Sequence, residues 1–255
     1  MDFPRLVSML DREALFFVKA SKFRDLYEGT IPKYNDLNRA SVYEEQRNSF
    51  QSEEQFNRFI ETMPSTMKSL FKALREIILI NSWHYNEYES ADMWELYSQA
   101  NAGIAIQSTY RKLRDSFQNN TDDTVWIGKV NYLDFNKEWM NEWNTLEAFV
   151  IKRKYFAHED EIRAVTSLPD DHLGEKVLSE VDKERERVNP SKPRIVNPKE
   201  LTDKGKYVSS ELDILIENIY VSPSAEKWFK EVVESLVTKY GLSKNVIKSD
   251  LYTAD

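Results

Sequence analysis

Two residue types that build common functional sites are missing or scarce in this sequence. It has no cysteine, which excludes disulfides, thiolate metal ligands and cysteine nucleophiles and fits a reducing cytoplasm. It has only 6 glycines in 255 residues, well below the usual share of about 7%. The loops that cradle phosphates in P-loop and Rossmann proteins need several glycines close together. The composition therefore argues strongly against both of these classes.

The sequence also has few histidines and no long apolar run. Its three histidines, at positions 84, 158 and 172, are too far apart to predict a metal site. No apolar stretch reaches the roughly 18 residues of a membrane span, and the first residues lack the pattern of a signal peptide. We therefore expect a soluble, cytoplasmic protein without a membrane partner. The net charge of −8 argues against broad binding to nucleic-acid backbones, which needs a basic face.

The residues that are present predict a folded α+β protein. Apolar residues make up 41% of the chain and aromatic residues 13%, which is a globular composition. Strand-like and helix-like apolar patterns alternate along the chain. We expect strands at 14–18, 77–83, 104–107, 125–133 and 159–165. We expect helices before and after a break at Pro64, after a cap at Ser90, from Ser108 or Thr109 to Phe117, at 145–152, and from a cap at Ser222 to Gly241.

One stretch differs in composition from the rest. Residues 170–206 carry balanced acidic and basic charge and three prolines, with little apolar periodicity. Such a stretch buries little surface and is typical of a solvated segment. The sequence therefore predicts a single α+β domain of short mixed or antiparallel strands with packed helices, interrupted by a charged insertion at about 170–206.

Reactive and aromatic side chains gather at four places in the sequence. The first is the loop 19–29, where Lys19 and Arg24 stand among aromatic residues; it suits an anionic or aromatic ligand, or is simply a charged surface loop. The second runs from position 82 to position 90 and supplies stacking faces and hydrogen-bonding groups. The alternative interpretation is that the aromatic residues of this place pack in the core, as we expect for Trp94. The candidates at this second place are Ser82, Trp83, His84, Glu89 and Ser90.

The third place is the predicted strand 159–165. A period of two puts Glu159, Glu161 and Arg163 on one face of this strand. Such a row is either the solvent side of an edge strand, or a site that stabilises developing positive charge or orients a sugar hydroxyl. The fourth place, 219–223, is a strand end before a predicted helix start, where backbone N–H groups receive an anion or form an ordinary cap.

These places resemble a bacterial family of unknown function. The matching pieces are Leu15-Phe-Phe17, 21–29, Trp83, 89–97, 103–106, Lys154, Phe156, 158–163 and 219–223. Together they are similar to domain-of-unknown-function family 2971 over nearly the whole chain outside the charged insertion. One departure is Phe23-Arg-Asp-Leu-Tyr-Glu28, where many members have a Phe-Asn-Asp-Pro-Phe-Glu-like loop. The resemblance implies a fold but no established reaction.

The order of these pieces is also similar to the ADP-ribosyltransferase architecture. That architecture has a basic or histidine-bearing first strand, a serine-containing strand followed by a helix and a strand, and a late strand with a glutamate. The counterparts here are Lys19 or Arg24, Ser82 or Ser90, and Glu159 or Glu161. A lysine thus replaces the usual arginine or histidine, and the similarity is one of fold.

This second resemblance implies a domain that binds a nucleotide-like ligand, with transfer of ADP-ribose from nicotinamide adenine dinucleotide (NAD) to a macromolecular acceptor as the candidate reaction. Glu161 and Glu159 would be catalytic, and Glu161 would bind a ribose hydroxyl. No cofactor is certain, and NAD is the candidate substrate. The ligand-binding candidates are Lys19, Arg24, Ser82, Trp83, His84, Glu89, Ser90 and Arg163.

The alternative is a non-enzymatic module for protein interaction or defence, in which the same charged face contacts a protein partner. The two hypotheses differ in what they expect of the fold. A catalytic cleft predicts that the candidate carboxylates and Arg24 converge in space, whereas scattered exposed positions favour the interaction module.

Overall fold

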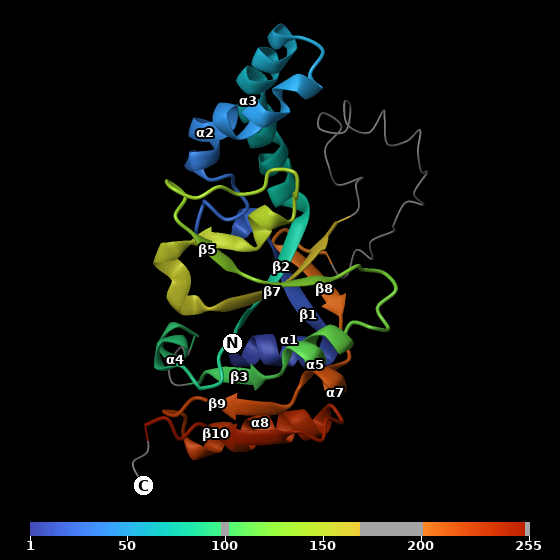
Figure 1. Ribbon diagram of the computed structural model, residues 1–255. Helices are drawn as coiled ribbons and strands as arrows, with labels where there is room; N and C mark the ends of the chain where they lie inside the picture. The colour runs from blue at the N-terminus through green and yellow to red at the C-terminus, as the bar shows by residue number, and fades with distance from the viewer. Residues whose placement is uncertain (98–101, 169–200, 253–255) are drawn as a thin grey trace. The chain divides into compact units, whose positions relative to one another are not determined.

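The computed structural model describes residues 1–97, 102–168 and 201–252 (Figure 1). Helices and mostly antiparallel strands are mixed along these residues, so the predicted α+β class is confirmed. The α-helices are α1 (Phe3–Arg12), α2 (Lys33–Tyr43), α3 (Glu53–Ile77), α4 (Ala91–Tyr97), α5 (Tyr110–Asp115), α7 (Leu212–Leu215) and α8 (Lys227–Lys239). The strands are β1 (Ala14–Lys19), β2 (Ile78–His84), β3 (Ile104–Gln107), β4 (Trp126–Lys129), β5 (Asn131–Leu133), β6 (Ile151–Arg153), β7 (Glu161–Ser167), β8 (Gly205–Ser209), β9 (Asn218–Val221) and β10 (Asn245–Lys248).

The chain divides into two compact units, each made of separate stretches. Unit 1 contains Met1–Phe16, Tyr85–Val125 and Lys206–Asp255, and unit 2 contains Phe17–His84 and Trp126–Gly205. The strands β1 and β8 each contribute residues to both units. The single-domain organisation stays a prediction.

The insertion predicted at 170–206 falls mostly outside the described residues, which resume at position 201. The last two residues of that approximate range, Gly205 and Lys206, lie in β8. Lys206 is buried, and its ammonium pairs with Asp123 at 2.7 Å. Gly205 and Lys206 therefore belong to the folded part of the chain.

The strand β7 lies in the interior of the unit 2 sheet. The antiparallel order is β4-β7-β2-β1, so β7 is paired along both edges. In the β2–β7 ladder Ser82 lies opposite Arg163. The side chains of β7 from Glu161 to Thr166 are buried. The interpretation of this segment as a solvated edge strand is therefore wrong.

The predicted strand 125–133 divides into β4 and β5 at Val130. The Val130 N–H donates to a carbonyl at the start of β7 (2.8 Å), whereas the Asn131 N–H donates to the Val150 carbonyl (2.8 Å). Consecutive residues thus bond to different neighbours, and the chain passes from the antiparallel sheet to a small parallel pair of β5 and β6.

The predicted helix 145–152 is wrong. A short 3₁₀ turn at Glu147–Phe149 is followed at once by β6. Ile151 lies opposite Asn131 in the parallel pair with β5. The apolar residues that suggested a helical stripe are instead held by this long-range pairing, a context that local patterns do not report.

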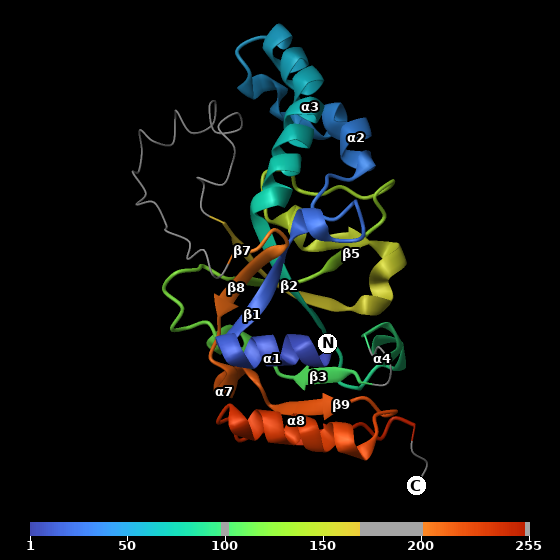
Figure 2. The ribbon, with the colours of Figure 1, turned by 180° about the vertical axis from the view of Figure 1, so that it is seen from behind.

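The predicted helix break at Pro64 is also wrong, because α3 continues through Pro64 to Ile77. The Ser52 hydroxyl caps the start of this helix by accepting the Gln55 N–H (3.2 Å). An interior proline loses one helical hydrogen bond, but the buried stripe of α3 extends on both sides of it. Both ribbon views show α2 beside α3 (Figures 1 and 2). No described helix, α3 included, is long and apolar enough to cross a membrane.

Unit 1 contains a sheet of order β10-β9-β3, in which β9 is antiparallel to β3 and parallel to β10. The helix α8 lies between β9 and β10 in the chain and beside this sheet (Figure 2). It ends at Lys239, and Gly241 follows with a φ of 76°, which suits glycine. Its predicted start is wrong, because α8 begins at Lys227. The Ser222 hydroxyl bonds to the Ser224 hydroxyl (2.9 Å) instead of capping the helix.

The predicted start of α4 is confirmed. The Ser90 hydroxyl accepts the Met93 N–H (3.3 Å), which is the bond expected of an N-cap. Trp94 is buried, as expected of a core residue. Its indole N–H donates to Glu89 (2.8 Å), which also accepts from the Ser249 hydroxyl. Two of the candidate site residues therefore hold the α4 region of unit 1 together.

Gly205 provides a test of the packing between β1 and the start of β8. A Cβ at this position would lie 1.9 Å from the Phe17 carbonyl oxygen, whereas a Cβ at Gly128 would lie 3.4 Å from a Val150 methyl. We predict that Gly205→Ala lowers the free energy of unfolding by about 2 kcal/mol or more, because the backbone must shift. The matched variant Gly128→Ala should change it by at most about 0.5 kcal/mol. Urea denaturation measures both, and equal stability of the two variants would contradict the prediction.

Candidate functional site

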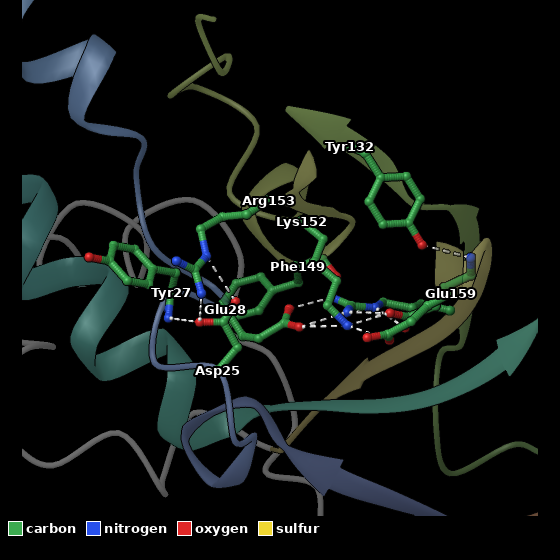
Figure 3. Close-up of polar contacts among 10 residues, drawn as sticks. Asp25, Tyr27, Glu28, Tyr132, Phe149, Lys152, Arg153 and Glu159 are labelled. Carbon is green, nitrogen blue, oxygen red and sulfur yellow. Dashed lines mark hydrogen bonds and ion pairs between the residues drawn. The ribbon is translucent and has the colours of Figure 1, made fainter. Parts of the chain in front are cut away.

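Five charged side chains meet within unit 2 and are called the ionic cluster here. They are Glu28, Lys152, Glu159, Glu161 and Arg163. Glu28 comes from the loop that follows β1, and Lys152 lies on β6. Glu159 is the last residue of a 3₁₀ helix, Lys154–Glu159, and the other two residues lie on β7. Figure 3 shows the network of hydrogen bonds and ion pairs that joins them.

Arg163 is the most deeply buried member, with a side chain 0% exposed. Its guanidinium donates to both oxygens of Glu28 (2.8 and 3.0 Å) and to Glu161 (3.0 Å). It also donates to the Phe149 carbonyl (2.9 Å). A buried guanidinium is tolerated only when it is paired and hydrogen-bonded in this way.

The loop that carries Glu28 is shaped by its own residues. Asp25 accepts the Tyr27 N–H through its side chain (3.1 Å) and the Glu28 N–H through its carbonyl (3.1 Å). The next residue, Gly29, has a φ of 69° and lies so close to Phe149 that a Cβ would meet its ring at 2.5 Å. Glycine is therefore required here, and the turn directs Glu28 toward Arg163.

Lys152 joins the three carboxylates of the cluster. Its ammonium donates to Glu159 (2.6 Å) and Glu161 (2.7 Å) and lies 3.4 Å from Glu28. Burial alone would lower the pKa of Lys152, but its hydrogen bonds to Glu159 and Glu161 outweigh burial and raise it. Lys152 is therefore a permanent cation in this environment.

The two neighbouring glutamates differ in their electrostatics. Burial alone would raise the pKa of Glu161, but the adjacent cations Arg163 and Lys152 lower it to about 2. Burial raises the pKa of Glu159, and the nearby Glu161 adds to this effect against the attraction of Lys152. The Glu159 side chain is 23% exposed, against 6% for Glu161. Glu161 is thus a fixed internal anion, and Glu159 is the carboxylate of the cluster that reaches solvent.

The backbone between the two glutamates makes a left-handed turn at an aspartate, one of the few non-glycine residues enriched in this conformation. Asp160 has a φ of 33°, in the left-handed region that non-glycine residues rarely adopt. The Glu161 N–H that follows donates to the Tyr132 hydroxyl (3.0 Å). Burial and the Glu161 carboxylate raise the pKa of Tyr132 to about 12, so its hydroxyl stays protonated. Residues held in such conformations concentrate at functional sites, where surrounding contacts enforce them.

His84 lies beside Glu159. Its Nδ1 is 2.6 Å from the Glu159 carbonyl oxygen, which only accepts, so Nδ1 carries the proton. Its Nε2 is buried and has no hydrogen-bond partner within the described part of the chain. With a proton on Nδ1, Nε2 carries a lone pair that no donor of the described residues meets.

An aromatic platform adjoins the ionic cluster; it consists of Tyr27, Arg153, Tyr155 and Phe156. The Arg153 guanidinium lies over the Tyr27 ring at 4.2 Å, the Phe156 ring at 5.4 Å and the Tyr155 ring at 5.9 Å. Asp25 accepts two hydrogen bonds from this guanidinium (2.9 and 3.2 Å), as Figure 3 shows. The contacts of Arg153 with three rings are cation–π interactions.

No family model, curated protein or solved structure matches this chain. The resemblances to family 2971 and to the ADP-ribosyltransferase architecture therefore stay predictions. Within the described residues, no cluster of three or more histidines and carboxylates is arranged to hold a metal ion. The interpretation of the site rests on its geometry and charge.

Unit 2 brings several of the predicted site residues together. Glu159, Glu161 and Arg163 are linked through the ionic cluster, and His84 contacts Glu159. Ser82 is exposed on β2, opposite Arg163 in the ladder. The indole N–H of the adjacent Trp83 donates to Asn81.

Other predicted site residues have different surroundings. Glu89 and Ser90 belong to unit 1, where they hold Trp94 and the start of α4. Lys19 is half-buried at the end of β1, and its backbone N–H donates to the Lys204 carbonyl (2.9 Å). Arg24 is exposed in the loop that carries Glu28. Among the described residues, neither of these two side chains pairs with the ionic cluster.

Sequence reasoning missed Glu28 and Lys152. Glu28 is the last residue of the Phe23–Glu28 piece that carries the family resemblance, so a signal for it was present. Lys152 was hidden because its segment was interpreted as the end of a helix rather than as β6. Only the pairing of β6 with β5 reveals that Lys152 points into the cluster.

Arg163 provides the first test of the cluster. We predict that Arg163→Met lowers the free energy of unfolding by about 3 to 5 kcal/mol, because it leaves Glu28 and Glu161 buried without their main cation. The control Lys129→Met removes a solvent-exposed ion pair with Asp160 (3.2 Å) and should cost at most about 1 kcal/mol. Urea denaturation compares the two. Similar losses in both variants would mean that the buried pairing is not the source of stability.

Glu161 provides a pH test. Its pKa falls from an ordinary 4.5 to about 2 on folding, so the ionised form stabilises the fold above pH 4.5 and this contribution is lost as pH falls toward 2. We predict that the stability gap between wild type and Glu161→Gln closes across this window, by at most about 1.4 kcal/mol per pH unit. Urea denaturation at a series of pH values measures the gap. A gap independent of pH would contradict the assignment.

Proposed function

We propose that unit 2 binds a nucleotide-like ligand through a hydroxyl group at Glu159, with NAD as the candidate substrate and ADP-ribose as the group transferred. The observation that carries this proposal is the state of Glu159. It is a partly exposed carboxylate, held by the buried Lys152 ammonium at 2.6 Å, next to a histidine whose Nε2 has no partner within the described residues. A partly exposed carboxylate of this kind accepts hydrogen bonds from the hydroxyls of a ribose diol.

The proposed transfer requires stabilisation of positive charge on a sugar. The bond between C1′ of the ribose and the nicotinamide nitrogen breaks, and its electron pair leaves with nicotinamide. A nucleophile of the acceptor forms the new bond at C1′ and loses its proton. The sugar carries oxocarbenium character between these events, and a fixed carboxylate such as Glu159 stabilises it.

The geometry favours different roles for the two predicted catalytic glutamates. Both oxygens of Glu161 are already engaged by Arg163 and Lys152, and its side chain is buried. Glu161 is therefore proposed as a positioning residue that acts through Lys152. Lys152 in turn directs Glu159 toward solvent, so Glu159 is the residue that would contact the substrate.

A protein-interaction or defence-associated module is the second candidate function. The members of the ionic cluster satisfy most of one another's hydrogen bonds, which also suits a purely structural role in holding segments of unit 2 together. Leu26 and Tyr27 precede Glu28 in the sequence and Tyr155 lies on the 3₁₀ helix that ends at Glu159, and all three residues are exposed. Exposed apolar groups of this kind occur at protein-binding surfaces. A partner protein would then contact this face without turnover.

Glu159→Gln discriminates between the two functions. We expect calorimetric titration to detect NAD binding to the wild type, and the variant to bind at least about tenfold more weakly, the share of one charge-assisted hydrogen bond. Mass spectrometry should detect ADP-ribose on protein or nucleic-acid acceptors only with the wild type. Stability should change little, because Lys152 keeps Glu161 and Glu28 as partners.

The matched control is Glu138→Gln, which also neutralises a partly exposed carboxylate paired with a lysine, Lys154. It should leave NAD binding unchanged. If wild type shows no binding at millimolar NAD, the transferase proposal fails and the interaction module is the better account.

A further inference from the structure

We propose that the aromatic platform of Tyr27, Arg153, Tyr155 and Phe156 is a stacking site for a flat heteroaromatic ring, and that it binds the purine base of the ligand. This inference rests on the proposed function, in which the ribose of the same ligand binds at Glu159. It adds the part of the protein that recognises the base, because the proposed function specifies only the hydroxyl group that Glu159 binds.

The first support is the way in which Arg153 is held. Two hydrogen bonds from its guanidinium to Asp25 fix the plane of the group, and the Tyr27 ring lies 4.2 Å from its central carbon. The charge of Arg153 is therefore already balanced by a carboxylate. A guanidinium neutralised in this way is a poor anchor for a phosphate, and its flat face already covers the Tyr27 ring and holds that ring in place.

The second support is the exposure of the rings around Arg153. The side chain of Tyr155 is 81% exposed and that of Tyr27 is 53% exposed. These rings are large apolar surfaces that the fold does not cover, and they adjoin a cation whose own position is fixed. Aromatic side chains and arginine planes are the groups on which proteins stack nucleobases, because every base has a π-face.

The third support is the link between the platform and Glu159. Phe156 contacts both cations, since the Lys152 ammonium lies 4.8 Å and the Arg153 guanidinium 5.4 Å from its ring. Phe156 and Glu159 are three residues apart on one 3₁₀ helix, and side chains with this spacing share a face. Phe156 of the platform and Glu159 of the hydroxyl site are therefore neighbours on one element, which is the arrangement that a base with an attached ribose requires.

Calorimetric titration with two probes, adenosine monophosphate (AMP) and ribose 5-phosphate, tests the inference. The platform variant is Tyr155→Ala, which removes a side chain that is largely exposed to solvent. We expect it to weaken AMP binding about tenfold or more and to leave ribose 5-phosphate binding unchanged, because only AMP has a base to stack. Tyr155→Trp keeps an aromatic ring at this position and should bind AMP about as tightly as wild type. The control Tyr110→Ala removes a tyrosine of unit 1 that is 50% exposed and should have no effect.

The variant Glu159→Gln, titrated with the same probes, separates this inference from the proposed function. If AMP binds Tyr155→Ala as tightly as wild type while Glu159→Gln weakens both probes, the stacking site is overturned and the hydroxyl site stands. If Tyr155→Ala weakens AMP and Glu159→Gln weakens neither probe, the stacking site stands and the hydroxyl site is overturned. If wild type binds neither probe at millimolar concentration, both are overturned.

Discussion

The buried guanidinium of Arg163 is the constraint on which the rest of the site depends. A cation removed from water costs several kcal/mol unless carboxylates and hydrogen bonds replace its hydration. Arg163 meets this requirement with Glu28 on one side and Glu161 on the other. The loop after β1 is therefore tied to β7, and Gly29 is needed because the turn at Glu28 passes directly against Phe149. The charge of Arg163 thus holds together three segments of unit 2, namely the loop after β1, the turn at Phe149 and β7.

The charge balance of the cluster explains why only one carboxylate is left for a ligand. Two cations face three carboxylates, so at least one carboxylate must share a cation. Glu161 contacts both cations and is buried, whereas Glu159 contacts Lys152 alone and reaches solvent. The pKa values of the two glutamates consequently move in opposite directions. Pairs of titratable groups separated in this way commonly divide two roles between them.

Local physics made several features of this fold predictable from sequence. The cap at Ser90, the buried Trp94 and the strand containing Glu161 and Arg163 follow from short-range patterns, and all three are present. The period of two correctly placed Glu161 and Arg163 on one face. The same pattern could not decide whether that face met solvent or an interior, because burial depends on which strands lie on either side.

The features that escaped prediction depend on contacts distant in sequence or on an exceptional backbone. Lys152 enters the cluster only because β6 pairs with β5, and no local sequence pattern within 145–152 predicts that pairing. Glu159 was predicted on the strand, but the left-handed turn at Asp160 ends the preceding 3₁₀ helix and places Glu159 before β7. Aspartate is one of the few non-glycine residues that adopt this conformation, but Asp160 alone does not predict that a turn interrupts the segment at this position. The turn separates Glu159 from the buried strand, and this separation leaves Glu159 as the most exposed carboxylate of the cluster.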